Sequence, residues 1–452
     1  MKTYNRRIGF LISDQHLIAH GGIGQFTKSF VEMCNRIKSG WKVDVILDKA
    51  PTGEFYKLIE SLGANIVYPK EPLKYSDHTA TFVFSDTINF EKIINFRNAI
   101  LQAFETNLYD MLICNTQEAM SAAYALSIHD YIPVMFYTHS PNMIFRDTHG
   151  TDAFLDSYHV FYNKHMEFEG ITIGTQSQKN VDELEKHGAT NVALLRMPMS
   201  ERNLLVPYTG PKSGVLFIGR WEERKNPQAY IDAMKECGLP CKVMTNSNGA
   251  KKFEKAFAIA GITNFDIRIG ITGKEKVEFI KTSKVFFMPS LHENYPFAFS
   301  ECLGHMPCVV LDNQNWSDQF DSRFYVKCNI RNAARVIQSA YDTSQQSFEA
   351  LSYIRTLDSE TAQGWIHYLN SFSGKRSNSS NAKINSHTTV KYRDFIVSLD
   401  RSHLAREDFE SVLSNRHKFI NVLYSDKDTY LSKDPTFLPK EEAIGRALFQ
   451  GL

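Results

Sequence analysis

The feature that most constrains the fold is a repeated alternation of short apolar runs with longer amphipathic segments. In the first half of the chain, apolar runs of strand length cover residues 8–13, 41–47, 65–68, 111–114 and 133–137. Segments with apolar residues at helical spacing lie between them, and residues 26–37 are the first of these. Strands that alternate with helices in this way form a parallel sheet with helices on both faces, joined by right-handed crossovers.

The alternation stops at residues 196–214 and then starts again. This segment, RMPMSERNLLVPYTGPKSG, has the proline and glycine content of a linker. Beyond it the strand-like segments return at residues 214–219, 241–245, 266–269, 285–288 and 308–311. Helices are predicted over residues 227–237 and 358–372, and the second of these closes the pattern. The restart predicts a second sheet of the same kind.

We therefore predict an α/β chain in three parts. Two doubly wound, Rossmann-like domains cover residues 1–200 and 201–372, because 452 residues exceed what one hydrophobic core usually serves. Residues 373–452 form a basic linker and a C-terminal extension without the strand rhythm. The linker is rich in Ser and Asn, as flexible segments are. The linker and the start of the extension carry the basic residues Lys375, Arg376, Lys383, Lys391 and Arg393.

The composition argues against several classes of protein. A formal net charge of +1 and a pI of about 7.6 disfavour a globally basic nucleic-acid binder, though not a local basic patch. No apolar run reaches the length of about 18 residues that a membrane span needs, and the N-terminal run is too short for a signal peptide. The seven cysteines are scattered and mostly inside apolar runs, which is typical of a reduced, cytoplasmic protein.

The first motif that could carry chemistry is a glycine-rich segment, Gly21, Gly22 and Gly24, after the first predicted strand. Ligands of doubly wound sheets bind at the carboxyl ends of the strands. Glycines there let backbone N–H groups approach a phosphate or a sugar, helped by the N-terminus of the next helix. The alternative is a tight turn between strand and helix, and GGIGQF lacks the third glycine of the dinucleotide pattern.

The second motif, GRWEERKN, follows the first strand of the second domain and contains Arg220 and Lys225. Two cations at the carboxyl end of a strand suit a diphosphate, whose negative charge grows as it departs as a leaving group. Arginine offers a planar fork of donors, and lysine offers a mobile point charge. The alternative is a solvated loop whose charges compensate one another.

The third motif, HENYPFAFSECLGHMPCVV, places Glu293 and Glu301 eight residues apart. If Pro296 opens a helix, Glu301 lies about one turn into it and Glu293 in the loop before it. One carboxylate can then accept hydrogen bonds from ribose hydroxyls and the other from a sugar, while backbone amides at the helix start meet phosphates. The alternative is a capped amphipathic helix with acidic residues on its surface.

Taken together, the three segments resemble the retaining glycosyltransferase family 4, which has the GT-B fold of two Rossmann-like domains. Family members show a GGxG-like loop, a GR-x4-K segment and an E-x7-E segment followed by G-x-P-V-V, in this order. The resemblance covers roughly residues 6–372. The chain departs from the family where Phe-Gly usually follows the first glutamate, and at Cys302, where alanine is usual. Both departures concern the preference for a donor sugar.

The resemblance implies a role for each motif. Residues 201–372 would bind a nucleotide-sugar donor, and residues 1–200 would form the acceptor side. Arg220 and Lys225 would bind the donor diphosphate, Glu301 would hold the ribose, and Glu293 would hold the hydroxyls of the transferred sugar. The predicted donor-binding residues are Gly21, Gly22, Gly24, Arg220, Lys225, Glu293, Asn294, Tyr295, Pro296, Phe297 and Glu301.

The resemblance also implies a histidine in the active-site cleft, after an inner strand of the first domain. His139 follows the apolar run PVMFY and is the candidate, while a loop histidine bonded to backbone is the alternative; His20 is a weaker candidate. No cofactor or metal is predicted, because cationic side chains and helix dipoles can supply the positive charge. The D-x-D pattern at residues 426–428 is interpreted as surface charge. The predicted catalytic residues are His139, Glu293, Arg220 and Lys225.

The family mechanism would be a retaining, front-face transfer in which the leaving diphosphate serves as the base, so that no enzyme nucleophile is required. The basic residues after position 373 suit contacts with a phosphate backbone, or else belong to a solvated linker. The first interpretation favours a hydroxymethylated base of phage-type DNA, extruded into the cleft, as acceptor. A cell-surface saccharide or a lipid is the alternative acceptor. The competing functions are a GT-B-fold nucleotide-sugar epimerase and a non-catalytic sugar-nucleotide binder.

Overall fold

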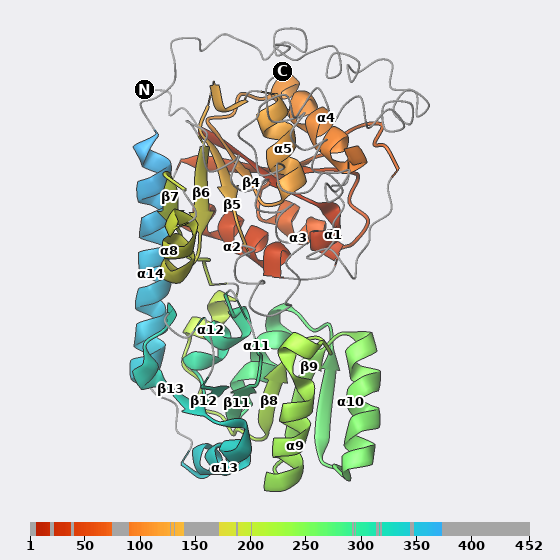
Figure 1. Cartoon of the computed structure of the whole chain (residues 1–452), viewed down its shortest axis with the longest axis vertical. Coiled ribbons are helices and arrows are strands. Elements are labelled where there is room, and N and C mark those ends of the chain that lie inside the picture. The colour runs from red at the N-terminus through yellow and green to blue at the C-terminus, as the bar shows by residue number, and fades with distance from the viewer. Residues whose placement is uncertain are drawn as a thin grey trace, which may run out of the picture. The chain divides into compact units, whose positions relative to one another are not determined.

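The computed structural model describes residues 6–18, 22–37, 40–74, 90–126, 128–130, 132–139, 171–186, 189–199, 201–291, 293, 295–312, 316, 319–343 and 348–372. Contacts divide the chain into unit 1, Met1–Leu195 with Trp365–Leu452, and unit 2, Arg196–Gly364. Each unit contains one sheet with helices packed against it (Figure 1). The predicted linker and extension, residues 373–452, lie outside the described residues.

The sheet of unit 1 has seven parallel strands in the order β3-β2-β1-β4-β5-β6-β7. In the middle of the sheet, Ile8 lies beside Val43 on one side and Met111 on the other. The strand order reverses between β1 and β4, so the carboxyl ends of these strands form the switch point where doubly wound sheets bind ligands. The strands are β1 (Arg6–Ile12), β2 (Trp41–Leu47), β3 (Asn65–Val67), β4 (Met111–Cys114), β5 (Val134–Tyr137), β6 (Ile171–Thr175) and β7 (Val192–Leu194).

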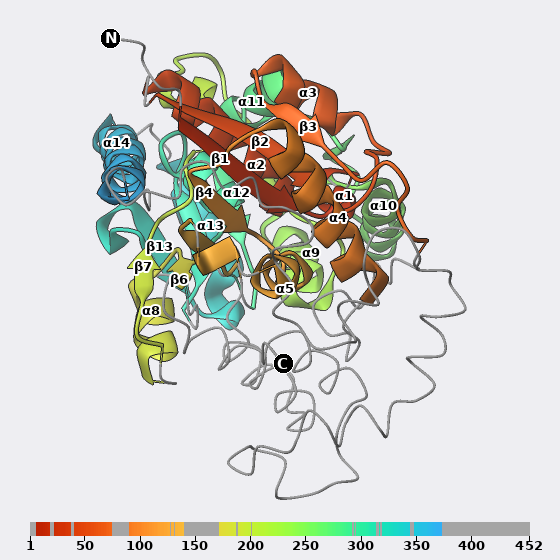
Figure 2. The ribbon, with the colours of Figure 1, turned by 90° about the horizontal axis from the view of Figure 1, so that it is seen from above.

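Helices cover both faces of this sheet (Figures 1 and 2). Because successive side chains of a strand point to opposite faces, neighbouring residues of β1 enter different layers. Phe10 packs against Phe26 and Phe30 of α2 (Gly22–Arg36), at ring-centroid distances of 5.6 and 5.0 Å. Leu11 belongs to the core on the other face, with α4 (Phe90–Thr106) and α5 (Gln117–Ala125). The shorter helices are α1 (Asp14–Ile18), α3 (Phe55–Ser61) and α8 (Gln178–Lys186).

The sheet of unit 2 has six parallel strands in the order β10-β9-β8-β11-β12-β13. They are β8 (Val215–Ile218), β9 (Cys241–Thr245), β10 (Phe265–Ile269), β11 (Val285–Met288), β12 (Cys308–Leu311) and β13 (Tyr325–Cys328). Val215 and Phe217 enter one core, with α9 (Pro227–Cys237), α10 (Ser247–Ala260) and α13 (Ala333–Asp342). Leu216 enters the other core, with α11 (Gly273–Lys281), α12 (Phe297–Leu303) and the first part of α14 (Phe348–Ser371).

Helix α14 is shared by the two units, because the division falls between Gly364 and Trp365. Trp365 is fully buried, and its ring centroid lies 4.9 Å from that of Phe30 and 5.7 Å from that of Tyr137. The sequence predicted that the helix over residues 358–372 closes the second domain. Its last turns belong to unit 1 instead, since burial of the large indole ties them to α2 and β5.

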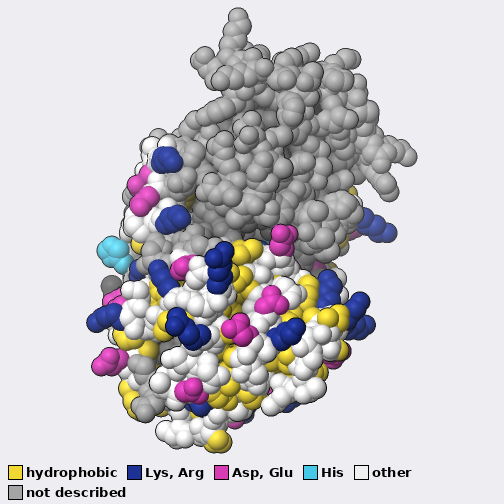
Figure 3. All heavy atoms as spheres, turned by 60° about the horizontal axis from the view of Figure 1, so that its bottom comes forward, with side chains coloured by type: hydrophobic (Ala, Val, Ile, Leu, Met, Phe, Trp, Pro, Cys, Tyr) yellow, Lys and Arg dark blue, Asp and Glu magenta, His cyan; other side chains and the backbone are white. Residues whose placement is uncertain are grey.

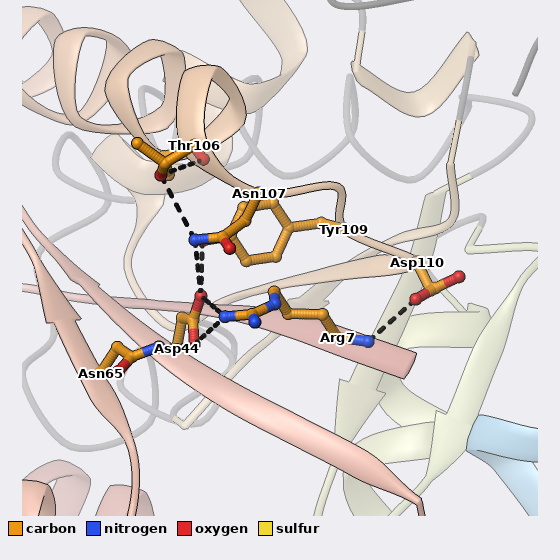
Figure 4. A network of polar contacts seen from close by, with 8 residues as sticks. Arg7, Asp44, Asn65, Thr106, Asn107, Tyr109 and Asp110 are labelled. Atoms are coloured by element: carbon orange, nitrogen blue, oxygen red, sulfur yellow. Dashed lines mark hydrogen bonds and ion pairs between the residues drawn. The ribbon is translucent and has the colours of Figure 1, made fainter. Parts of the chain in front are cut away.

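A buried ionic network links β1 and β2 with the start of β3 and with the segment before β4 (Figure 4). Arg7 Nη1 donates to both carboxylate oxygens of Asp44, at 2.8 and 2.6 Å. The Tyr109 hydroxyl donates to the same carboxylate at 2.8 Å, and Asn65 Nδ2 donates at 3.0 Å. Asp44 is buried, and an isolated carboxylate there would be costly, so these donors are what allow the charge to be buried.

The predicted elements and the observed ones differ at several places. The short strands β6, β7 and β13 were not predicted, α2 begins at Gly22 rather than at residue 26, and α14 begins at Phe348 rather than at residue 358. The glycine-rich segment therefore runs into the first turn of a helix. None of the helices within the described ranges has both the length and the apolar character that crossing a membrane requires.

Candidate functional site

The candidate site in unit 2 is built on the loop that follows β8. A short 3-10 turn, Glu223–Lys225, ends at Asn226, whose φ of 49° lies in the left-handed region that asparagine tolerates. Pro227 then starts α9, where its fixed φ suits the first helical position. The turn brings Lys225 back over the end of β8, since a Cβ at Gly219 would lie 3.5 Å from Lys225 Cδ.

Lys225 forms an ion pair with Glu293, the first glutamate of the third motif. Arg224 Nη1 lies 3.9 Å from the other carboxylate oxygen of Glu293. A backbone hydrogen bond of 2.7 Å from the Leu291 N–H to the Arg224 carbonyl joins the loop after β8 to the loop that leads to Glu293. Burial by itself raises the pKa of Glu293, but Lys225 and Arg224 outweigh burial and hold the pKa below its ordinary value. Glu293 is therefore an ionised hydrogen-bond acceptor at neutral pH.

Arg220 lies on the same loop and remains accessible. Its side chain is 57% exposed, and its Nη2 lies 2.8 Å from Glu222 Oε1. Glu222 also accepts a hydrogen bond of 3.1 Å from Arg224 Nε. The charges of the loop thus compensate one another. Exposed ion pairs of this kind are weak, so Arg220 can exchange its carboxylate partner for another anion at little cost.

Glu301, the second glutamate, is buried on α12, and Pro296 directly precedes the first residue of that helix. Lys276 Nζ of α11 lies 2.5 Å from Glu301 Oε1. Each glutamate of the E-x7-E segment is therefore paired with a lysine from a different element of unit 2. Sequence analysis did not identify Lys276. Its only signal in the sequence is that the apolar Ile280 follows four residues later, which places both residues on the same face of a helix.

The residues between the two glutamates pack against the apolar core of unit 2. The ring of Tyr295 lies 5.2 Å from that of Phe297 and 5.8 Å from that of Phe320. Burial raises the pKa of Tyr295, so its hydroxyl stays protonated, and Pro296 is also buried. These positions have a packing role, and their contact with a donor stays a prediction. Asn294 lies outside the described residues.

In unit 1, Gly22 and Gly24 form the start of α2, and Gly21 lies outside the described residues. A Cβ at Gly24 would lie 2.5 Å from the backbone carbonyl oxygen of His16. Glycine at this position therefore has a packing reason, the close approach of α2 to the segment after β1. A contact between these glycines and a donor stays a prediction.

His139 follows β5 and is held on several sides. Its Nε2 lies 3.0 Å from Asn115 Oδ1, and its carbonyl accepts a hydrogen bond of 3.0 Å from Gln176 Nε2. The ring meets those of Phe26 and Tyr137 edge-on, at 5.4 and 5.1 Å. Burial lowers the pKa of His139 to about 3, so the imidazole is neutral at physiological pH. Asn115 follows β4 and His139 follows β5, so both lie at the carboxyl edge of the sheet.

Two further residues, His16 and Lys92, were not identified from the sequence. Burial lowers the pKa of His16, and the charge of Lys92 lowers it further. Lys92 Nζ of α4 lies 3.5 Å from Glu118 Oε1 of α5, and Lys92 is buried. Within the described part of the chain, no group of three His, Cys, Asp or Glu side chains is placed to hold a metal ion.

No protein-family profile matches the sequence, and no curated protein matches it significantly. Solved structures do match. HepE from Anabaena, in complex with UDP and glucose, has a TM-score of 0.57 at 14% identity, covering 81% of this chain and 97% of that one. Sucrose-phosphate synthase from Thermosynechococcus elongatus has a TM-score of 0.57 at 13% identity, covering 80% and 94%. WaaG, a glycosyltransferase of lipopolysaccharide biosynthesis, has a TM-score of 0.56 at 11% identity, covering 81% and 100%. The chain has the GT-B fold.

The GT-B fold confirms the fold class that the sequence predicted. Its two Rossmann-like sheets are those of seven and six strands in units 1 and 2. Within this fold, the charged residues of the second and third motifs lie in unit 2, and His139 lies in unit 1. A fold hosts many activities, so function has to be argued from these residues.

Proposed function

We propose that the protein is a glycosyltransferase that moves a sugar from a nucleotide-diphosphate sugar to an acceptor hydroxyl. The observation that carries the proposal is the pairing of Lys225 with Glu293 beside the accessible Arg220, at the carboxyl end of β8. This arrangement joins groups that can bind a diphosphate to a carboxylate that can bind sugar hydroxyls. It occurs on a fold shared with HepE, which has been solved with UDP-glucose, and with WaaG.

In this proposal the cations of the loop after β8 change partners when the donor binds. Arg220 and Lys225 contact the diphosphate and stabilise the negative charge that develops on it as the glycosidic bond breaks. Glu293, which is ionised, accepts hydrogen bonds from hydroxyls of the transferred sugar. Glu301 accepts hydrogen bonds from the ribose hydroxyls. Positioning and charge stabilisation then account for the catalysis, with configuration retained and the leaving diphosphate as the base.

His139 contributes a neutral imidazole on the acceptor side. A neutral ring both donates and accepts, so it can hold a hydroxyl without adding a charge to the site. Asn115 Oδ1, at 3.0 Å from Nε2, fixes the orientation of the ring when Nε2 carries the proton. Nδ1 is then the acceptor, and it is the atom we assign to the hydroxyl contact.

The acceptor is proposed as a hydroxymethylated base in DNA, with a saccharide or lipid as the alternative. The basic residues that suggested DNA lie beyond position 373, outside the described residues. On the face drawn in Figure 3, Lys and Arg side chains of the described residues are interspersed with Asp and Glu and with apolar side chains. That face shows no large basic surface, and in this proposal the basic residues of the linker and extension contact the DNA backbone.

The test measures release of nucleoside diphosphate from a panel of nucleotide sugars, starting with UDP-glucose. Each donor is incubated alone, with hydroxymethylcytosine DNA, and with saccharide and lipid acceptors. Transferase activity requires release that rises with an acceptor and is lost in Lys225→Ala but kept in Lys251→Ala, an exposed lysine of α10. Stimulation by saccharide or lipid alone would refute the DNA acceptor. Interconversion of donors without any release would refute the transferase and favour an epimerase.

A further inference from the structure

The pair Lys276–Glu301 is more deeply buried than Lys225–Glu293, whose side chains are 18% and 7% exposed, and both pairs differ from the exposed ion pairs of unit 2. The side chain of Glu301 is 1% exposed and that of Lys276 is 11% exposed, with 2.5 Å between Nζ and Oε1. By contrast, Arg220 and Glu222 are 57% and 30% exposed, and Arg268 and Asp266 are 47% and 44% exposed.

Stability alone is a poor reason for such a pair. Taking both charges out of water offsets most of their attraction, and apolar side chains of the same volume often serve a core as well or better. The surroundings here would accept them, because Val277 and Ile280 of α11 and Phe299 and Cys302 of α12 belong to one apolar core. A lysine and a glutamate at this place therefore point to a use for the charged carboxylate.

We infer that Lys276 is a positioning residue for recognition of the donor ribose through Glu301. The inference rests on the proposed function, in which Glu301 accepts hydrogen bonds from the ribose hydroxyls. Lys276 holds Oε1 from α11, which restricts rotation of the carboxylate and compensates its charge in an apolar environment. A charged acceptor forms hydrogen bonds about twice as strong as a neutral one. Lys276 itself does not contact the nucleotide.

A purely structural role would be a tie between α11 and α12. The two roles predict different effects of removing the lysine. Loss of a structural tie lowers the free energy of unfolding and weakens the binding of every nucleotide alike. Loss of a positioning residue weakens the binding of a nucleotide that has the 2′-hydroxyl more than that of one that lacks it.

The experiment compares binding of UDP and 2′-deoxy-UDP to the full chain by titration calorimetry. If another donor is active, its nucleoside diphosphate and the 2′-deoxy form are used. The wild type is expected to prefer the ribonucleotide by roughly tenfold or more, as one charge-assisted hydrogen bond implies. Lys276→Met is expected to reduce the preference to less than threefold, while Lys276→Arg keeps it. Lys281→Met, at another buried lysine of α11, is the matched control and keeps it.

Lys276→Gln keeps a hydrogen-bond donor but not the charge, and it is also expected to reduce the preference for the ribonucleotide. It replaces Lys276→Met in the comparison if that variant does not fold. Thermal unfolding of each variant separates lost folding from lost recognition. An unchanged preference in folded Lys276→Met and Lys276→Gln would overturn the inference while leaving the proposed function intact. Failure of the wild type to bind any nucleoside diphosphate would overturn the proposed function itself. A wild type that binds both forms equally would overturn the role of Glu301 and the inference with it.

Discussion

Replacing Glu293 by glutamine is expected to tighten the binding of a nucleoside diphosphate and to slow sugar transfer. Glu293 is paired with Lys225, and Arg224 Nη1 lies 3.9 Å from its other carboxylate oxygen. Under the proposed function the diphosphate takes Lys225 as its partner, and the ionised carboxylate then repels the phosphates. Glutamine removes this charge while keeping an oxygen that accepts hydrogen bonds.

The size of the effect can be worked out from Coulomb's law. A phosphate that contacts Lys225 Nζ on the side away from Glu293 lies roughly 6 Å from the carboxylate, because each contact spans about 3 Å. Two unit charges at this distance repel by about 3 kcal/mol at an effective dielectric constant of about 20. Arg220 is 57% exposed, so water reaches the loop and reduces this value. We expect UDP to bind between about fivefold and about a hundredfold more tightly.

The assay is titration calorimetry with UDP on the wild type, Glu293→Gln and the control Glu236→Gln, an exposed residue near the end of α9. Release of UDP from UDP-glucose in the presence of acceptor is measured in parallel. We expect a slower reaction in Glu293→Gln, because a neutral amide holds the sugar hydroxyls less strongly. Equal or weaker UDP binding in Glu293→Gln would show that Lys225 does not exchange partners, and the reasoning would fail.

Three further predictions concern stability and are measured by urea unfolding. Burial lowers the pKa of Lys242 to about 8 from 10.5. Between these two pH values the unfolded chain binds more protons at this lysine than the folded chain does. The stability of the wild type therefore rises with pH, because the cost of burying the charged lysine disappears. The stability of Lys242→Met relative to wild type is expected to fall by up to about 3 kcal/mol between pH 7 and pH 10.5, and a pH-independent difference would contradict this. Tyr109→Phe removes a buried hydrogen bond to the Asp44 carboxylate and is expected to cost about 1.5–3 kcal/mol; no loss would show that the carboxylate finds another donor. Gly24→Ala is expected to cost about 1–3 kcal/mol because its Cβ would meet a backbone carbonyl at 2.5 Å, whereas Gly364→Ala in α14, with no atom within 4 Å of its Cβ, should be neutral or stabilising. Equal effects of the two alanines would refute the packing argument.

Most of the strands that the sequence predicted have long apolar runs, and the edge strands β3 and β10 are exceptions. WKVDVIL and VFFM are buried throughout or nearly so, and continuous apolar character marks a strand in the middle of a parallel sheet. Two of the missed strands, β6 and β13, lack this signal. ITIGT of β6 contains two threonines and a glycine, and YVKC of β13 lies at the sheet edge with Val326 and Lys327 exposed. Their strand character comes from pairing with a neighbour rather than from their own composition.

The sequence named charged residues for the candidate site but not the ion pairs that they form. Lys225 and Glu293 were both singled out, yet nothing in the spacing of 68 residues indicates that they pair with each other. Lys276 was missed because a lysine in an amphipathic helix usually lies on its solvated face. Trp365 was assigned to the wrong unit because helical periodicity shows that a face is buried but not which sheet buries it.

The sharing of α14 between the units has a consequence for the order in which the protein can fold during synthesis. Unit 2 is one continuous segment, Arg196–Gly364, so a ribosome delivers it whole. Unit 1 begins earlier but is completed later, since Trp365, which packs against Phe30 and Tyr137, is made only after all of unit 2. The rings of Phe30 and Tyr137 therefore lack their contact with Trp365 while unit 2 is translated. The half of the molecule made first is thus the last to be finished, and a chain stopped at Gly364 would contain all of unit 2 and an incomplete unit 1.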